Sequence, residues 1–269
     1  MALNYIMHLG DGNVLKVEYH KSVPSVIELA RSYAKAGKPD RFVVFSETQT
    51  KYSSVGEPLE DGDTETGVYL SLILRPSIFP SQASFIGAMS AVALITALEE
   101  HSSKRFGLGW VSDVYCEGRK IGCTCTEGML DSFSSYEYII VSFAVKLSET
   151  DFPPRLKDLI KKVFESESSS ISHIIAKNIL TKFFALYPRR LKSPDKFMDI
   201  FKKKFILSGT KIYYNENGKK RGAKVVAVDT SNGTLMVSAK GGKVKRLTNQ
   251  GGVYIPSKIK LKPIGRRNK

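Results

Sequence analysis

The sequence of 269 residues is poor in cysteine, in tryptophan and in long apolar runs. Three cysteines (Cys116, Cys123 and Cys125) are too few for a disulfide framework in a chain of this size, so a reducing, intracellular compartment is expected. The longest apolar stretch, residues 83–98, is shorter than the ~20 residues that span a bilayer. The start also lacks the basic region of a signal peptide. We therefore expect no membrane span and no secretion, with the protein in the cytoplasm or in an organelle matrix.

Negative charge is scarce in the second part of the chain. Residues 1–150 hold 13 Lys+Arg and 18 Asp+Glu, a net charge of −5, whereas residues 151–269 hold 28 and 8, a net charge of +20. This asymmetry predicts an anionic partner for the C-terminal part, either nucleic acid or an acidic protein. A basic surface kept only for solubility is the alternative.

Strand and helix patterns follow one another in the first part of the chain and predict an α+β domain over residues 1–205. Apolar residues at helical or alternating spacing distinguish the two, with a tight turn expected at Glu117-Gly118 and a long acidic loop over 48–66. The strands are expected at 14–19, 41–46, 68–75, 109–115, 120–126 and 138–147, and the helices at 24–36, 81–100, 155–165, 172–185 and 194–205.

Short strands with tight turns between them occupy the last segment and predict a small SH3-like β-barrel over 206–256, followed by a basic tail at 257–269. The strands are expected at 210–214, 223–229, 234–239, 243–247 and 252–255, with turns at Asn217-Gly218, Asn232-Gly233 and Gly241-Gly242.

Basic residues recur in clusters on and near this predicted barrel, with tyrosines among them. Small basic barrels commonly bind the phosphates of RNA or DNA, so RNA or another polyanion is a candidate partner. The candidate residues are Lys202, Lys203, Lys204, Lys219, Lys220, Arg221, Lys243, Lys245 and Arg246.

Three segments resemble the motifs of the biotin protein ligases. Residues 67–76 read Gly-Val-Tyr-Leu-Ser-Leu-Ile-Leu-Arg-Pro, similar to the family's Asn-Leu-Tyr-Leu-Ser strand. Residues 110–122 read Trp-Val-Ser-Asp-Val-Tyr-Cys-Glu-Gly-Arg-Lys-Ile-Gly and, with Glu127, are similar to Trp-Pro-Asn-Asp followed by Lys-[Ile/Leu]-[Gly/Ala]-Gly and a Glu. Residues 47–50 resemble Glu-x-Gln-[Ser/Thr]. The order also agrees. The resemblance implies a biotin/lipoate ligase-like mixed sheet flanked by helices, followed by the small SH3-like barrel.

The resemblance further implies a function. Such ligases adenylate biotin with ATP (and Mg²⁺) and transfer it to a lysine of an acidic carrier domain; a homodimer is compatible with this class. The resemblance assigns the catalytic role to Lys120 and Asp113, and no metal site to the protein itself. It assigns biotin and nucleotide contacts to Ser22, Gln49, Thr50, Lys51, Trp110 and Gly122.

Several positions depart from the family's motifs. The family's glycine- and arginine-rich ligand loop is Lys51-Tyr-Ser-Ser-Val-Gly here, and the second glycine after Lys120 is Cys123. The family's Gly-x-Gly-x-Asn strand is Ser142-Phe-Ala-Val-Lys146. These changes predict weakened or lost ligase activity. The cysteines are expected in the core rather than on zinc.

Three hypotheses remain open at this point. The first is a biotin protein ligase with an impaired site. The second is a catalytically silent relative, a pseudoenzyme, whose basic C-terminal region binds RNA or another polyanion as part of a ribonucleoprotein. The third is a lipoate or octanoate transferase.

Overall fold

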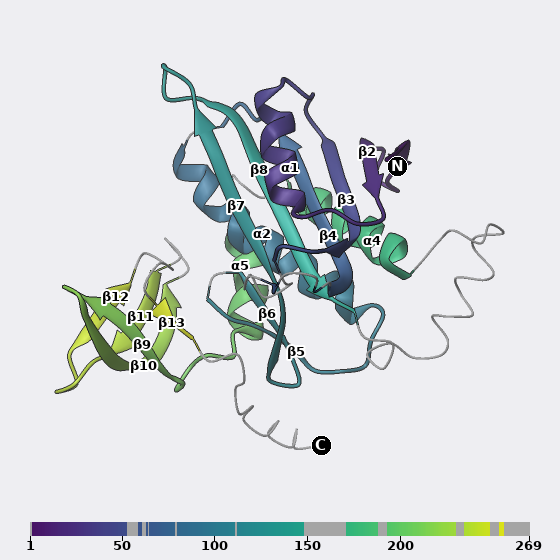
Figure 1. Ribbon diagram of the computed structural model, residues 1–269. Helices are drawn as coiled ribbons and strands as arrows, with labels where there is room; N and C mark the ends of the chain where they lie inside the picture. Colours follow the sequence, from purple (N-terminus) through teal and green to yellow (C-terminus); the bar gives the residue numbers. More distant parts are fainter. Residues whose placement is uncertain are drawn as a thin grey trace.

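The computed structural model describes residues 2–52, 59–60, 63, 65–78, 80–110, 112–147, 171–187, 193–229, 234–247 and 253–255 (Figure 1). The helix predicted at 155–165, the turn at Asn232-Gly233, the basic tail and part of the acidic loop lie outside these residues.

An eight-stranded mixed sheet forms the larger part of the structure, in the order β1-β2-β3-β4-β8-β7-β6-β5. All neighbours are antiparallel except β2 and β3, which are parallel because helix α1 connects them. The strands are β1 (Leu3–His8), β2 (Val14–His20), β3 (Phe42–Gln49), β4 (Glu65–Leu74), β5 (Phe106–Leu108), β6 (Asp113–Cys116), β7 (Arg119–Leu130) and β8 (Tyr136–Lys146).

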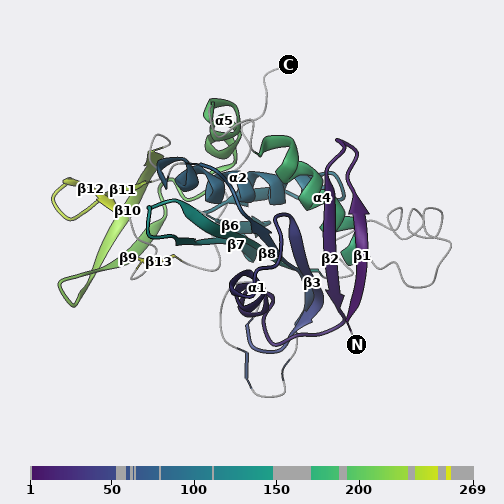
Figure 2. The ribbon, with the colours of Figure 1, turned by 90° about the horizontal axis from the view of Figure 1, so that it is seen from above.

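Helices cover both faces of this sheet. Figure 2 shows α1 on one side and α2, α4 and α5 on the other. Their bounds are α1 (Val26–Lys35), α2 (Pro80–Glu99), α4 (Ile171–Leu186) and α5 (Asp195–Lys204). In the part of the chain that the structure describes, no helix is long and apolar enough to cross a membrane.

Side chains of alternate residues fill a core on each face of the sheet. On β8, Val141 and Phe143 pack toward α2 and α4, whereas Tyr138 and Ile140 pack toward α1. Because both faces are covered, the central strands have near-continuous apolar sequences.

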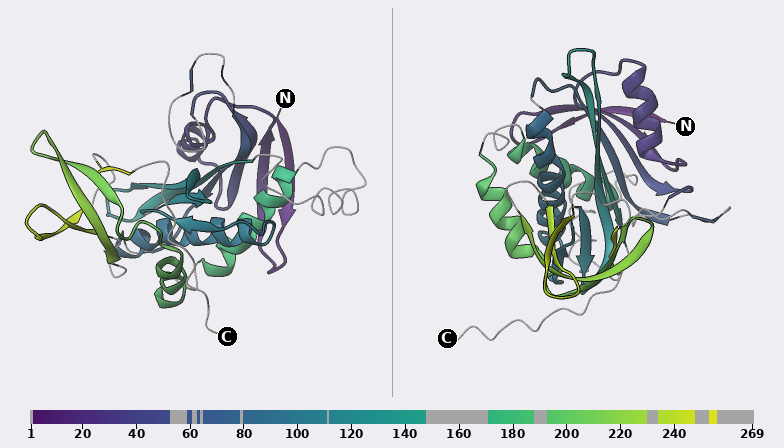
Figure 3. Two further views of the ribbon diagram at one scale, coloured as in Figure 1. Left: turned by 90° about the horizontal axis from the view of Figure 1, so that it is seen from below. Right: turned by 90° about the vertical axis from the view of Figure 1, so that its left-hand side faces the viewer.

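A second, five-stranded sheet lies at the far end of the molecule from β1 and β2 (Figure 3). Its order is β12-β11-β10-β9-β13, and the SH3-like barrel predicted for this segment stays a prediction. Its strands are β9 (Lys211–Glu216), β10 (Lys219–Asp229), β11 (Thr234–Ser238), β12 (Val244–Leu247) and β13 (Val253–Tyr254). We call it the C-terminal sheet.

The structure corrects two of the predictions for individual strands. Strand β1 was not predicted, because it is an edge strand in which apolar residues such as Leu3 and Ile6 are exposed. Of the strand predicted at 109–115, only the part from Asp113 onward is a strand, β6, and β5 before it was not predicted. The two strands are connected through a close approach in which the Gly109 N–H donates to the Asp113 carbonyl at 2.8 Å. A Cβ at Gly109 would lie 2.9 Å from Asp113, so this close approach requires glycine.

Candidate functional site

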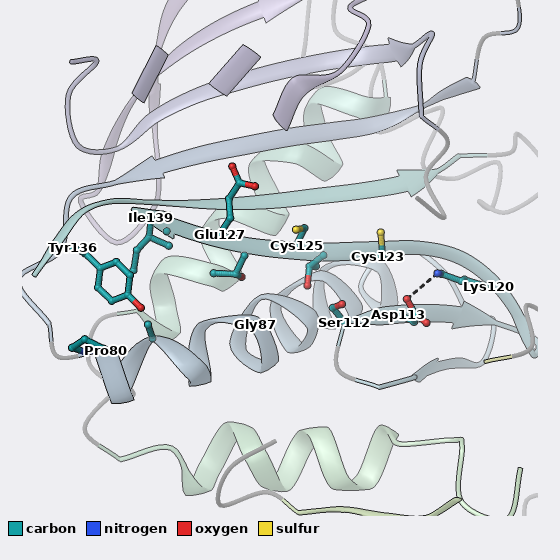
Figure 4. A pocket seen from close by; sticks show the side chains of 14 residues that line it. Pro80, Gly87, Ser112, Asp113, Lys120, Cys123, Cys125, Glu127, Tyr136 and Ile139 are labelled. Carbon is teal, nitrogen blue, oxygen red and sulfur yellow. Dashed lines mark ion pairs between the residues drawn. The ribbon is translucent and has the colours of Figure 1, made fainter. Parts of the chain in front are cut away.

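Two neighbouring cavities lie against β7, and Figure 4 shows the residues that line the larger one. The larger cavity, of about 680 Å³, lies between β7 and the first half of α2; the smaller, of about 320 Å³, lies between α1 and the pair β7–β8. Cys123 and Cys125 line both cavities, so we treat them together as the cleft. Volumes of ~300–1,000 Å³ are typical of small-molecule sites.

Lys120 and Asp113 form an ion pair in the wall of the larger cavity, with Nζ 2.9 Å from Oδ1. The tight β6–β7 hairpin brings them together, and its predicted turn is confirmed by positive φ angles at Glu117 (48°) and Gly118 (80°). Burial raises the pKa of Asp113, and the Lys120 ammonium opposes that shift. Because such partly buried charges are costly away from water, a pair in a cavity wall is suited to holding a charged ligand group.

Gln49 is buried, and its side-chain amide forms hydrogen bonds with backbone groups. Its Oε1 accepts from the Val26 N–H and its Nε2 donates to the Tyr52 carbonyl, both at 2.9 Å. Gln49 therefore connects the start of α1 to the chain after β3, and it lines the smaller cavity from that position. The neighbouring Lys51 forms an ion pair with Glu28 at 2.7 Å, and the hydrogen bond to Glu28 raises the pKa of Lys51.

Ser25 lines the smaller cavity, whereas Ser22 and Thr50 are exposed and are not among the residues around either cavity. The Ser25 hydroxyl caps α1 by accepting from the Glu28 N–H at 3.4 Å. Ser25 was not among the predicted site residues, although Ser25-x-x-Glu28 is a recognisable capping signal.

A bidentate ion pair connects α1 to β7 beside the cleft. Arg31 Nε lies 2.8 Å from Glu127 Oε1, and Nη2 lies 2.7 Å from Oε2. Arg31 lines the smaller cavity and Glu127 the larger, so the pair lies where the two adjoin. No sequence signal connects two residues 96 positions apart, and this contact was not predicted.

The prediction that the cysteines are core thiols is right only for Cys116, which is buried. Cys123 and Cys125 project side by side from one face of β7, as Figure 4 shows, because residues two apart on a strand share a face. Burial raises the pKa of Cys123 to about 12, so its thiol is uncharged at neutral pH. Over the described residues, no group of three or more His, Cys, Asp or Glu side chains is placed to hold a metal ion.

Trp110 is only 2% exposed and packs in the core of the C-terminal sheet with residues such as Leu207 and Ile212. It also lines a third cavity, of about 300 Å³, together with Lys120 and Asp113. Gly122 has a different constraint: a Cβ there would lie 2.4 Å from the Ala144 carbonyl oxygen, so the pairing of β7 with β8 requires glycine.

Four of the nine basic residues predicted to bind a polyanion form ion pairs within the protein. Lys204 pairs with Glu99, and Lys245 pairs with Glu216. The other two pairs are Arg221–Glu216 at 3.7 Å and Arg246–Asp229 at 4.0 Å. The remaining five, for which no such pair occurs within the described segments, are Lys202, Lys203, Lys219, Lys220 and Lys243.

Comparison with known proteins identifies the class of fold. The structure superposes on the biotin protein ligase of Aquifex aeolicus in complex with biotin and ATP with a TM-score of 0.61, at 18% identity, over 88% of this chain and 97% of that one. It also matches a biotin protein ligase-like protein of unknown function from a Silicibacter species, with a TM-score of 0.59 and 12% identity over 91% and 97%. The fold is that of the biotin protein ligases, which confirms the predicted α+β class.

The sequence agrees with this class, although no family model matches it. It is 24% identical over 176 residues to the bifunctional ligase/repressor BirA of Bacillus subtilis, which covers 63% of this chain and 53% of that protein. The match to BirA of Bacillus spizizenii is 23% over 171 residues. The chain thus spans about half the length of these relatives. The chain is thus similar to the biotin protein ligases in its fold and in part of its sequence, as its motifs predicted.

Proposed function

We propose that the cleft binds an acyl adenylate of the biotinyl-5′-AMP type and that the chain forms it from biotin and ATP with low activity. The observation that carries this proposal is the Lys120–Asp113 pair in the wall of a cavity large enough for a nucleotide. Replacing a partly buried ion pair with apolar residues is often neutral or stabilising. The presence of this pair beside a cavity is therefore explained better by ligand binding than by stability.

In the proposed reaction, a carboxylate oxygen of biotin attacks the α-phosphorus of ATP and pyrophosphate leaves. Lys120 Nζ is a compact donor that stabilises the negative charge developing on the α-phosphate, and Asp113 holds that ammonium in position at 2.9 Å. Mg²⁺ would arrive on the nucleotide phosphates, since it usually keeps several waters and few protein ligands.

Three features of the cleft support low rather than full activity. The Lys51 ammonium, the one cation in the first part of the ligand loop, is paired with Glu28. Gln49 has its amide engaged with the backbone. The side chains of Cys123 and Ser142 occupy the smaller cavity where the family has glycine, which reduces the room for a bicyclic acyl group.

The proposed partner is an acidic biotin carrier domain, by analogy with the family, and the proposed location is intracellular. A lipoate or octanoate ligand is the main variant of this proposal. A linear acyl chain is narrower than biotin and tolerates a partly filled cavity better, so both ligands belong in the test.

The test is pyrophosphate exchange together with calorimetry, using biotin, lipoate, octanoate and biotinyl-5′-AMP. We expect measurable binding of biotinyl-5′-AMP at micromolar concentration and a loss of about 10²–10³-fold in exchange for Lys120→Ala. The matched control is Lys177→Ala, on an exposed lysine of α4, which should behave as wild type. Absence of binding by all four ligands at high micromolar concentration would refute the proposal; a preference for octanoate or lipoate would reassign the acyl group.

A second candidate function, binding of RNA or another polyanion, is favoured by one separate observation. The C-terminal sheet has exposed lysines on its outer face, among them Lys220, that form no ion pair with a described carboxylate. Its test is affinity for RNA, which must fall as salt rises.

A further inference from the structure

The outer face of the C-terminal sheet exposes tyrosines that its core does not need. Along β9, Ile212 and Tyr214 are buried, whereas Lys211 and Tyr213 point outward. This alternation follows from the pleat of the strand. An outward position on such a sheet ordinarily holds a polar residue, so the tyrosines here indicate a surface with a partner.

Two of these tyrosines stand side by side. Tyr213 on β9 and Tyr254 on β13 are directly opposite each other in the antiparallel register, and they are 38% and 56% exposed. Gly222 on β10 is the other neighbour of Tyr213. Because a Cβ at Gly222 would come within 3.6 Å of the Tyr213 ring, the glycine leaves that flank of the ring open.

Lysines face these rings instead of carboxylates. Lys220 Nζ lies 4.8 Å from the ring centre of Tyr213 and 5.2 Å from that of Tyr254, and Lys211 Nζ lies 5.3 Å from that of Tyr213. Neither lysine forms an ion pair with any carboxylate that the structure describes. We call Lys211, Tyr213, Lys220 and Tyr254 the tyrosine platform.

We infer that the tyrosine platform binds single-stranded nucleic acid, with bases stacked on Tyr213 and Tyr254 and the phosphates held by Lys211 and Lys220. This inference rests on the second candidate function and gives it a defined surface. Base stacking on an exposed aromatic ring is worth more than an exposed cation–π contact. A base can therefore replace Lys220 at the ring, and the released ammonium can reach the adjoining phosphate.

The composition of the platform favours a single strand over other anions. A duplex keeps its bases stacked inside and would use only the lysines. An acidic peptide would likewise leave the tyrosine faces unused. A single strand uses both parts, since every base has a π-face and every nucleotide a phosphate.

The test measures the fluorescence anisotropy of a labelled oligouridylate at low and at moderate salt, with duplex RNA and inorganic polyphosphate as competitors. We expect Tyr213→Ala and Tyr254→Ala each to weaken binding of the single strand about fivefold to a hundredfold. The corresponding Phe variants keep the ring and should bind as wild type. Lys220→Met should weaken binding and reduce its salt dependence.

Matched controls lie outside the platform. Val226→Ala changes an exposed β10 residue that is 42% exposed, and Lys16→Met changes an exposed lysine of β2 at the other end of the molecule; both should leave binding unchanged. Normal unfolding curves for the Ala variants would establish that they fold.

Two results would overturn the inference. Equal affinity for polyphosphate and for the oligouridylate, with no effect of either Tyr→Ala change, would support general polyanion binding and refute base stacking on the tyrosine platform. Absence of oligouridylate binding at low salt would refute both polyanion binding and base stacking on the tyrosine platform. Neither result bears on the adenylate proposal, which pyrophosphate exchange tests separately.

Discussion

The cleft and the tyrosine platform both contain charged side chains, but they use them in opposite ways. In the cleft, Lys120 and Arg31 each contact a carboxylate of the protein, at 2.9 and 2.7 Å. On the platform, Lys211 and Lys220 lie over aromatic rings and form no ion pair with a carboxylate of the described residues. Cations that are paired within the protein fix the shape of its walls, whereas cations over rings keep their charge available to a partner. The ligand of the cleft must therefore compete with an existing ion pair, and the ligand of the platform need not.

The largest expected effect on stability comes from truncating Trp110, which adjoins both the cleft and the C-terminal sheet. Trp110→Ala removes a buried side chain from the core of the C-terminal sheet beside Lys120, so the free energy of unfolding should fall by about 3–5 kcal/mol. Chemical denaturation measures this loss. Phe133→Ala, at an 87% exposed position, is the control and should change stability by less than about 0.5 kcal/mol. A loss of stability for Trp110→Ala as small as that of the control would contradict the packing of Trp110 in the core of the C-terminal sheet.

The next effect sharpens the comparison by changing only the cleft. Cys123→Gly combined with Ser142→Gly empties part of the smaller cavity and should raise the affinity for biotinyl-5′-AMP roughly tenfold. Calorimetry measures the gain. Stability should fall by about 1 kcal/mol, because the buried hydrogen bond between Ser142 and Ser71 (2.8 Å) is lost. Val226→Gly on the C-terminal sheet is the control. Unchanged affinity would show that these side chains do not limit the ligand.

A smaller effect concerns the ion pair beside the cleft. A double-mutant cycle on Arg31 and Glu127 should give a coupling of about 0.5–1 kcal/mol in the free energy of unfolding, because both side chains are partly exposed and solvent screens them. The coupling should shrink at high salt. The same cycle on Lys220 and Tyr213 should give less. A larger coupling on the platform than at Arg31–Glu127 would reverse the comparison.

The smallest expected effect is on the pH dependence of stability. His101 Nε2 lies 3.0 Å from Asn178 Nδ2, which can only donate, so this contact needs an unprotonated ring nitrogen. Burial lowers the pKa of His101 below its ordinary 6.5. The folded protein therefore binds fewer protons than the unfolded chain below that pH, and the free energy of unfolding falls as the pH drops through 6.5 toward the folded pKa.

Denaturation midpoints at about pH 7.5 and about pH 5.5 measure this difference. His101→Gln should flatten it. Because this contact joins the segment after α2 to α4, acid should weaken the packing of these two helices against each other. An unchanged pH slope in the variant would assign the dependence to other groups.

Much of the fold could be predicted because its signals are local. The alternating pattern of β9 and the apolar run of α2 identify their own elements, and the turns at Glu117-Gly118 and Asn217-Gly218 occur where they were expected, with positive φ at all four residues. Strand β1 was missed because it is an edge strand in which only Met7 is buried, so its apolar residues show no clear alternation. The break after Gly109 was missed because its cause, a close approach to Asp113, is a property of the folded backbone.

In the candidate site, too, contacts between residues close in the sequence could be predicted and contacts between distant residues could not. The sequence motif placed Asp113 and Lys120 on one hairpin, and a short hairpin brings its two strands together in any fold. Arg31, by contrast, meets Glu127 only because α1 packs over the sheet, so no local pattern could reveal it. No local pattern could reveal the contact of Tyr254 with Tyr213 either, because it depends on the pairing of β13 with β9, which are far apart in the sequence.

Trp110 has a spectroscopic consequence. It is the single tryptophan of the chain, and its indole is almost fully shielded from water. Lys120, Asp113 and Tyr254 line the same cavity of about 300 Å³, so one fluorophore lies beside the ion pair of the cleft and beside a ring of the platform. Its emission is a built-in optical readout of both regions, and titrating each ligand in turn against that one signal needs no label on the protein.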